Sequence, residues 1–262
     1  MFAPAGRLAL ALSLALPAAA LAQGFEYAAG AAQYRITSTQ KAAQEMMGQK
    51  QELESSNNQL VTVNVARASK DTLSVSIVLD SITVIGPMGA GMDRLRGSKV
   101  VAKLSPGGTV YSAVGPTDDS IPNGAQLTEE MSRFLPKIKA KLAPGAAWSD
   151  TTTGKVKQGT MDVERKVVAN YKVVGDTTVG GEKSWKIARD AVTSLSGSGM
   201  NQGQQMSMEG TSNANGTLVV SQKGTFLGGQ SEDHATVKIV LAANGMEIGV
   251  TTTANTKIEK VK

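Results

Sequence analysis

The sequence predicts a mainly β protein, a long-stranded antiparallel meander curled into a half-open barrel around one amphipathic, Pro-kinked helix. Three observations predict this fold. Apolar and polar residues alternate with a period of two through most of the chain, short turn-rich stretches separate these runs, and one segment near 125–142 has apolar residues at helical spacing. Residues 23–262 are long enough for one large β domain, which is the simplest organisation.

The N-terminal stretch MFAPAGRLALALSLALPAAALAQGF has the features of a secretory signal peptide. Arg7 precedes an apolar run over 8–16, and Ala20-Leu21-Ala22 supplies an A-x-A cleavage site. The run is too short for a permanent membrane span, and no cysteine is present to carry an acyl anchor. The sequence therefore predicts that residues 1–22 are cleaved and that the mature protein is soluble, with a periplasmic or secreted location and no stable membrane span.

The C-terminal segment is the clearest predicted strand. Met246, Ile248 and Val250 begin an apolar face that alternates with polar residues up to Glu259. Asn244-Gly245 precedes it, a dipeptide that suits a type I′ hairpin because both residues adopt positive φ. An apolar face at Val237, Ile239 and Leu241 lies before the turn, so a hairpin is expected here.

Similar runs fill the rest of the chain. Residues 185–195 and 163–173 alternate, but Arg189 and Arg165 interrupt their apolar faces. Residues 213–216, NANG, are expected to form a turn that leads into a further strand. In the N-terminal half, MMGQ (46–49) and SPGG (105–108) are predicted hairpin tips, and a change of apolar face after Asp80-Ser81 indicates a β-bulge.

One segment has the pattern of a helix. Asn123 and Gln126 have the spacing of a capping box at its start. Pro136 is predicted to kink the helix, because proline removes a backbone donor and crowds the preceding turn. The apolar stripe comprises Leu127, Met131, Phe134, Leu135, Ile138 and Leu142.

Composition and motifs give little indication of catalysis. The absence of cysteine excludes disulfides, thiol nucleophiles and cysteine-bound metals. His234, the only histidine, follows Glu232 and Asp233 and is interpreted as a polar loop residue, and no G-x-S-x-G motif occurs. The lysines are scattered, which is typical of a soluble β surface rather than of a nucleic-acid site. We expect no enzyme activity, no cofactor and no nucleic-acid partner.

Three methionines in GMNQGQQMSMEGTSNANGTLVVS raise a metal hypothesis. Met206 and Met208 are two residues apart and share a strand face, and Met200 is a third thioether, so together they resemble a soft Cu(I) site. Methionine is also an adaptable core residue. An ordinary strand face is the favoured interpretation, with no metal bound.

The predicted sheet has a large apolar face to bury. One helix covers about 10 Å, whereas ten strands spaced by about 4.8 Å span far more, so the sheet must curl or close. Either arrangement favours an apolar interior that suits an apolar ligand, although a fully packed core is the alternative. The predicted ligand wall is Leu127, Met131, Phe134, Leu135, Ile138 and Trp185.

Two resemblances follow from these features. The signal peptide, meandering strands and inserted helix resemble the half-open barrel of bacterial lipoprotein-localisation factors and related periplasmic lipid carriers. RFLPKIKAKLAPGAAWSDTTTGKV, in which Pro144-Gly145 leads to Trp148 and a strand, is similar to an element of an uncharacterised family of exported bacterial β-rich proteins. The resemblance implies a carrier of a lipid or acyl chain, and it carries over no ligand-contacting residue.

Two other functions compete with a carrier. A structural or protein-interaction module of the envelope would have a packed core, an envelope protein as partner and no small ligand. Alternating strands are also typical of an outer-membrane barrel. Aromatic residues are only 4% of the chain, and the C-terminus ends in KIEKVK, so the sequence disfavours such a barrel.

Overall fold

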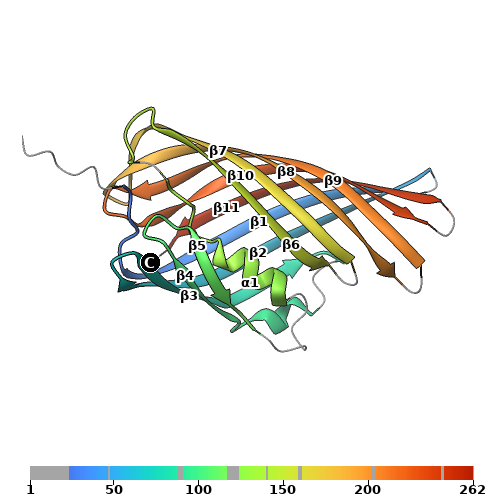
Figure 1. Ribbon diagram of the computed structural model, residues 1–262, viewed down its shortest axis with the longest axis horizontal. Helices are drawn as coiled ribbons and strands as arrows, with labels where there is room; N and C mark the ends of the chain where they lie inside the picture. The colour runs from blue at the N-terminus through green and yellow to red at the C-terminus, as the bar shows by residue number, and fades with distance from the viewer. Residues whose placement is uncertain are drawn as a thin grey trace, which may run out of the picture.

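Eleven strands form one antiparallel sheet in the computed structural model (Figure 1). The structure describes residues 24–46, 48–87, 91–116, 124–139, 141–158, 161–201, 204–242 and 245–261. The predicted signal peptide and Asn123 of the predicted capping box lie outside these ranges, as does Asn244 of the predicted C-terminal turn.

The elements follow one another in a simple order, and most strands are long. They are β1 (Gly30–Met46), β2 (Gln49–Ser69), β3 (Thr72–Ile85), the 3₁₀ helix η2 (Met92–Leu95), β4 (Lys99–Leu104), β5 (Val110–Val114), α1 (Gly124–Ser132), β6 (Ala147–Gln158), β7 (Met161–Val179), β8 (Glu182–Asn201), β9 (Gln204–Ser221), β10 (Phe226–Leu241) and β11 (Met246–Lys260).

The two edge strands of the sheet, β5 and β6, are consecutive strands in the chain. The strand order is β5-β4-β3-β2-β1-β11-β10-β9-β8-β7-β6, with β1 and β11 paired in the middle. The predicted antiparallel meander is confirmed, and the sheet is not closed. The connection between edge strands β5 and β6 contains α1, which contacts β4, β5 and β6 (Figure 1). This connection therefore crosses the open side of the curved sheet.

Alternation gives the sheet an inner apolar face and an outer polar face. Tyr34 pairs with Val61, and Val63 pairs with Ile77, so these side chains share the inner face. We call the end with β4, β5 and α1 the proximal half, and the end with the β1–β2, β8–β9 and β10–β11 hairpins the distal half. The main core lies against the inner face of the proximal half.

The outer face carries rows of oppositely charged side chains. Five exposed pairs join residues on two paired strands or residues two positions apart on one strand, with nitrogen–oxygen distances of 2.6–3.9 Å. Such exposed pairs contribute little stability. The pairs are Lys41–Glu54, Lys50–Glu52, Lys155–Glu164, Lys238–Glu247 and Lys257–Glu259.

The helix is shorter than predicted and does not contain Pro136. α1 ends at Ser132, and residues 133–139, which we call the floor segment, continue without helix. A proline disfavours helical geometry at the residue before it, so the chain leaves the helix instead of kinking. The backbone polar groups of the floor segment bind other segments. The Tyr27 hydroxyl donates to the Pro136 carbonyl at 2.6 Å, and Ile138 N donates to Gly107 O at 2.8 Å.

A glycine allows the floor segment to approach the β4–β5 turn. Gly108 has φ +91°, and a Cβ there would lie 2.6 Å from the Pro136 carbonyl oxygen. Any other residue would thus meet both backbone strain and a clash. The predicted SPGG hairpin is confirmed, and it also supports the floor segment. None of the helices in the ranges given above has the length and hydropathy needed to cross a membrane.

Several local predictions can be compared with the strands. The bulge near Asp80 is confirmed, since Leu60 pairs with Ser81 while Val61 pairs with Leu79. The turn predicted at 213–216 is wrong, because these residues lie inside β9. Ala214 and Gly216 face inward there, where small residues suit the curved sheet, and the asparagines face outward. His234 lies within β10 rather than in a loop.

Candidate ligand-binding cavity

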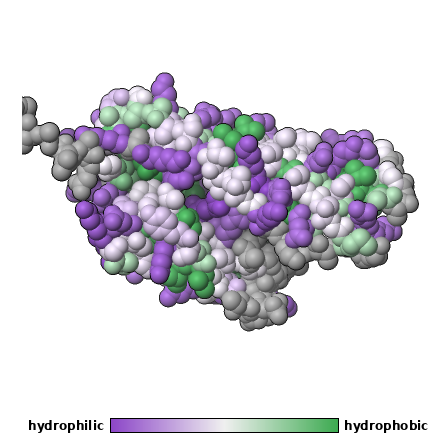
Figure 2. All heavy atoms as spheres, in the orientation of Figure 1, coloured by the Kyte–Doolittle hydropathy of each residue, from purple (hydrophilic) through white to green (hydrophobic). Residues whose placement is uncertain are grey.

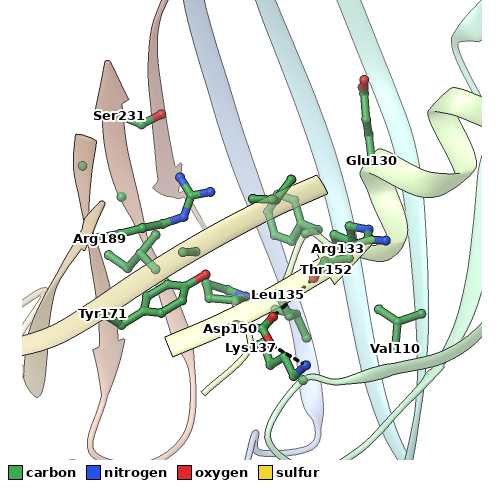
Figure 3. A pocket seen from close by; sticks show the side chains of 18 of the residues that line it. Val110, Glu130, Arg133, Leu135, Lys137, Asp150, Thr152, Tyr171, Arg189 and Ser231 are labelled. Atoms are coloured by element: carbon green, nitrogen blue, oxygen red, sulfur yellow. Dashed lines mark hydrogen bonds and ion pairs between the residues drawn. The ribbon is translucent and has the colours of Figure 1, made fainter. Parts of the chain in front are cut away.

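A cavity of about 690 Å³ lies between the inner face of the sheet and the floor segment. Strands β6 to β11 supply its wall, and the end of α1 closes one side. Figure 2 shows a hollow on the face that carries the open side of the sheet, with hydrophilic side chains around it. Figure 3 shows side chains from α1, the floor segment and the strands around the cavity.

The floor of the cavity is apolar and aromatic. Phe134 packs against Tyr34 and Phe226, with ring centroids 4.9 and 5.7 Å apart. The Tyr34 hydroxyl donates to the Phe226 carbonyl at 2.8 Å, and burial raises the pKa of this hydroxyl, so it stays protonated. Leu218 and Ile258 also line the cavity. These contacts fix a rigid apolar surface.

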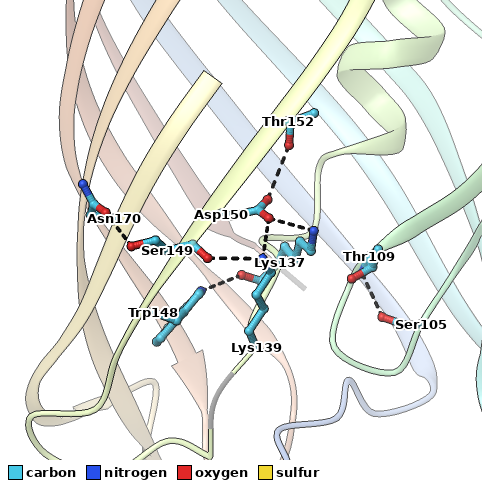
Figure 4. Close-up of polar contacts among 9 residues, drawn as sticks. All are labelled: Ser105, Thr109, Lys137, Lys139, Trp148, Ser149, Asp150, Thr152 and Asn170. Carbon is cyan, nitrogen blue, oxygen red and sulfur yellow. Dashed lines mark hydrogen bonds and ion pairs between the residues drawn. The ribbon is translucent and has the colours of Figure 1, made fainter. Parts of the chain in front are cut away.

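A group of polar contacts, which we call the clasp, ties the floor segment to edge strand β6 (Figure 4). The Asp150 carboxylate lies 2.8 Å from Lys137 Nζ and 2.7 Å from Lys139 Nζ. Trp148 Nε1 donates to the Lys137 carbonyl at 3.2 Å. Lys139 Nζ also donates to the Ser149 carbonyl at 3.2 Å. The clasp thus holds one edge of the sheet to the segment that covers its inner face.

The clasp keeps Asp150 ionised. Burial alone would raise the pKa of this carboxyl, but hydrogen bonds and positive charge from Lys137 and Lys139 outweigh burial. The pKa of Asp150 is therefore lowered. Two cations and one anion leave a local positive charge at the cavity wall.

Small residues make the cavity hollow. Ala169, Ala191 and Ala214 lie side by side on β7, β8 and β9 and form a separate buried cluster. A larger side chain at Ala169 would fill the space above the aromatic floor. Of the three alanines, Ala169 lines the cavity, and its small side chain leaves that part of the cavity open.

Next to the alanines, toward the floor, lies a row of polar side chains. Tyr171 pairs with Arg189, Arg189 pairs with Gly216, Gly216 pairs with Ser231, and Ser231 pairs with Thr256. All five residues line the cavity. Arg165 lines it farther along β7, and Arg133, at the end of α1, pairs with Glu129 at 3.4 Å. The cavity therefore combines apolar surface with hydroxyl and guanidinium donors.

The structure separates the predicted wall residues into two groups. Phe134 and Leu135 line the cavity. The other four pack with the main core: Leu127, Met131, Ile138 and Trp185. Their predicted contact with a ligand stays a prediction. Sequence reasoning did not assign Arg189, Tyr171 or Asp150 to the site, although it noted Arg189 as an interruption of an apolar face.

The three methionines of the copper hypothesis do not share a face. Met206 and Met208 are buried on the inner face of β9, as predicted from their spacing. Met200 is 52% exposed, and it lies one residue beyond the inward-facing Gly199. Among the described residues, no group of three or more His, Cys, Asp and Glu side chains is placed to hold a metal.

His234 has an outward position on the sheet. Its Nε2 lies 3.1 Å from Glu232 and its Nδ1 lies 3.2 Å from the Thr253 hydroxyl, with the imidazole 55% exposed. Asp233 faces inward and accepts a hydrogen bond from the Ser212 hydroxyl at 3.1 Å. The histidine and its neighbouring aspartate therefore lie on opposite faces of the sheet.

Comparison with known proteins identifies no family. No family model and no curated protein matches the chain. Among solved structures, Pseudomonas aeruginosa OccK2 (OpdF) is 7% identical with a TM-score of 0.34, and the match covers 88% of this chain and 98% of that one. A loop-deleted OmpT, an outer membrane protein of Vibrio cholerae, is 9% identical with a TM-score of 0.24 over 88% and 99% of the two chains. Such low scores carry no argument about activity.

These comparisons correct one prediction from the sequence. The similar solved structures are outer-membrane β-barrel proteins rather than periplasmic lipid carriers. The predicted periplasmic or secreted location is therefore contradicted, and we withdraw it. The resemblance to lipoprotein-localisation factors stays a prediction.

Proposed function

We propose that the protein binds a lipid or another ligand with an apolar chain, and that the curved sheet serves as a half-open barrel around it. The cavity carries this proposal. Its volume of about 690 Å³ lies within the range of about 300–1,000 Å³ that is typical of ligand sites. Its floor is aromatic, and it opens between the two edges of the sheet, so an elongated ligand has a route of entry.

Burial of apolar ligand surface would drive binding. Each Å² removed from water contributes about 25 cal/mol, and the preformed floor limits the entropic cost. No catalytic step is needed for this function.

Native mass spectrometry of delipidated protein with hexadecanol tests the proposal. We expect a one-to-one complex, because the alcohol offers an apolar chain without charge. Ala169→Phe should abolish it by filling the hollow, whereas Val168→Phe, on the opposite face of β7, should leave it intact. Val167→Phe, at another cavity-lining position, provides a second test if Ala169→Phe does not fold. Folded wild-type protein that binds no hexadecanol would contradict the proposal and favour a protein-interaction module.

A further inference from the structure

The polar row above the floor consists of donors that have no partner among the described residues. Within the part of the chain that the structure describes, the side chains of Tyr171, Arg189, Ser231 and Thr256 make no hydrogen bond or ion pair. All four line the cavity, and Arg189 is half-buried. Figure 3 shows Arg189, Tyr171 and Ser231 on the same side of the cavity. A half-buried guanidinium without an acceptor is costly unless water or a ligand supplies one.

Neighbouring acids do not neutralise this row, and Glu130, which also lines the cavity, lies on α1 across the cavity from Arg189 (Figure 3). Asp150 is bound by Lys137 and Lys139, and Glu129 is bound by Arg133. Asp233 faces inward but lies two strands from Arg189, and Ser212 donates to it. Arg189 is therefore the guanidinium of the row that stays available to an acceptor from outside the chain.

Space for such an acceptor lies beside Arg189. The adjacent residue in the row is Gly216, which has no side chain, and the row above it is the alanine row. A Cβ at Gly216 would lie 2.4 Å from the Gln230 carbonyl oxygen, so the position does not accept a larger residue without a backbone shift. The gap between Arg189 and Ser231 is thus built into the sheet.

We infer that this row binds a carboxylate or phosphate group at Arg189, with Tyr171 and Ser231 as flanking donors. A guanidinium binds these planar or tetrahedral oxyanions through two hydrogen bonds, and hydroxyl donors complete their coordination. The inference rests on the proposed function and names its ligand class, an amphipathic molecule with an anionic head and an apolar chain. The chain would contact Phe134, Leu218 and Ile258, which lie next to the row.

Palmitate and hexadecanol distinguish the head from the chain, because they differ only in the terminal group. We expect palmitate to bind about tenfold tighter than hexadecanol, as a charge-assisted hydrogen-bonded pair implies. Arg189→Met should reduce palmitate affinity to that of hexadecanol and leave hexadecanol affinity unchanged. Tyr171→Phe should weaken palmitate by about threefold. Isothermal titration calorimetry measures all five affinities.

Arg165 supplies the matched control. It is also on the inner face of β7, but it lies six residues from Tyr171, about 20 Å along the strand. Arg165→Met removes the same charge from the same cavity and should retain the preference for palmitate. A folded Arg189→Met variant that still prefers palmitate, or a wild type that binds both compounds equally, would overturn the inference.

Binding of inorganic phosphate tests whether the row takes a free anion rather than the head group of an amphipathic ligand. Phosphate that binds at Arg189 while hexadecanol does not bind would support the anion site and refute the proposed apolar-chain function. Binding of hexadecanol without any preference for palmitate would leave the proposed function standing and refute the anion site. The two proposals therefore fail separately.

Discussion

The proximal and distal halves of the sheet have the same alternating sequence but different burial. In the proximal half, Val75, Ile187 and Val220 are fully buried, at 0% exposure. In the distal half, Val237, Ile239 and Val250 face the same side of the same sheet but are only half-buried. The difference lies in what covers them, because α1 and the floor segment reach only the proximal half (Figure 1). Alternation thus determines the face, and a covering segment increases the burial, although Met206 and Met208 are buried in the distal half without contact with α1.

The cavity lies at the boundary between these halves. On its proximal side, the floor segment is fixed by the clasp and by the aromatic contacts of Phe134. On its distal side, the inner face continues without a covering element in the described chain. An elongated ligand in the cavity would therefore meet a rigid floor at one end and apolar strand surface at the other.

Shortening one inward-facing isoleucine in each half should give the largest difference in the free energy of unfolding. Ile187→Ala should lower the free energy of unfolding by about 3 kcal/mol, because it leaves a void in a closed core. Ile239→Ala should cost about 1 kcal/mol, since its side chain is already partly exposed to water. Urea denaturation followed by circular dichroism measures both. Equal losses would show that the distal half is covered as well as the proximal half.

The strands and their inward faces can be predicted from the sequence, but the segment that covers the proximal half cannot. The alternation of 246–258, the hairpin glycines and the bulge at Asp80 follow from local rules, and they determine strands and faces. The turn predicted at 213–216 fails because local turn propensity is weaker than pairing with β8 and β10 along the whole strand. The helix length fails because Pro136 ends the helix early, and only tertiary contacts show where the chain then goes.

The site is less predictable than the fold. Phe134 and Leu135 were found from helical periodicity, although neither lies in the helix of the structure. Arg189 was visible as an interruption of an apolar face, which is the signal that could have identified it. The clasp had no such signal, because Lys137, Lys139 and Asp150 meet only after the floor segment folds back against β6. Contacts between distant segments leave no periodic trace in the sequence.

Neutralising one acid in each half should give a smaller difference in the free energy of unfolding than the isoleucine variants. Asp150→Asn should lower the free energy of unfolding by about 1.5 kcal/mol, because the Asp150 side chain is only 10% exposed and two lysines would lose their counter-charge. Glu164→Gln breaks a distal pair with Lys155 whose side chains are 63% and 79% exposed, so it should change stability little. Chemical denaturation of both variants measures this contrast. A larger loss for Glu164→Gln would mean that the clasp does not hold the floor segment.

Acid should remove part of the stability that the clasp contributes, because it protonates Asp150. The pKa of Asp150 is lowered in the folded protein, whereas an unfolded aspartate titrates at about 3.9. Below about pH 3.9 the unfolded state binds more protons than the folded state, so the contribution of Asp150 to stability is complete above that pH and is lost as the pH falls through the lower folded pKa. The stability difference between wild type and Asp150→Asn should therefore be constant from about pH 7 to 5 and shrink below about pH 4. A difference that persists unchanged in acid would show that Asp150 acts through packing, and the charged clasp would no longer explain why the proximal half is covered.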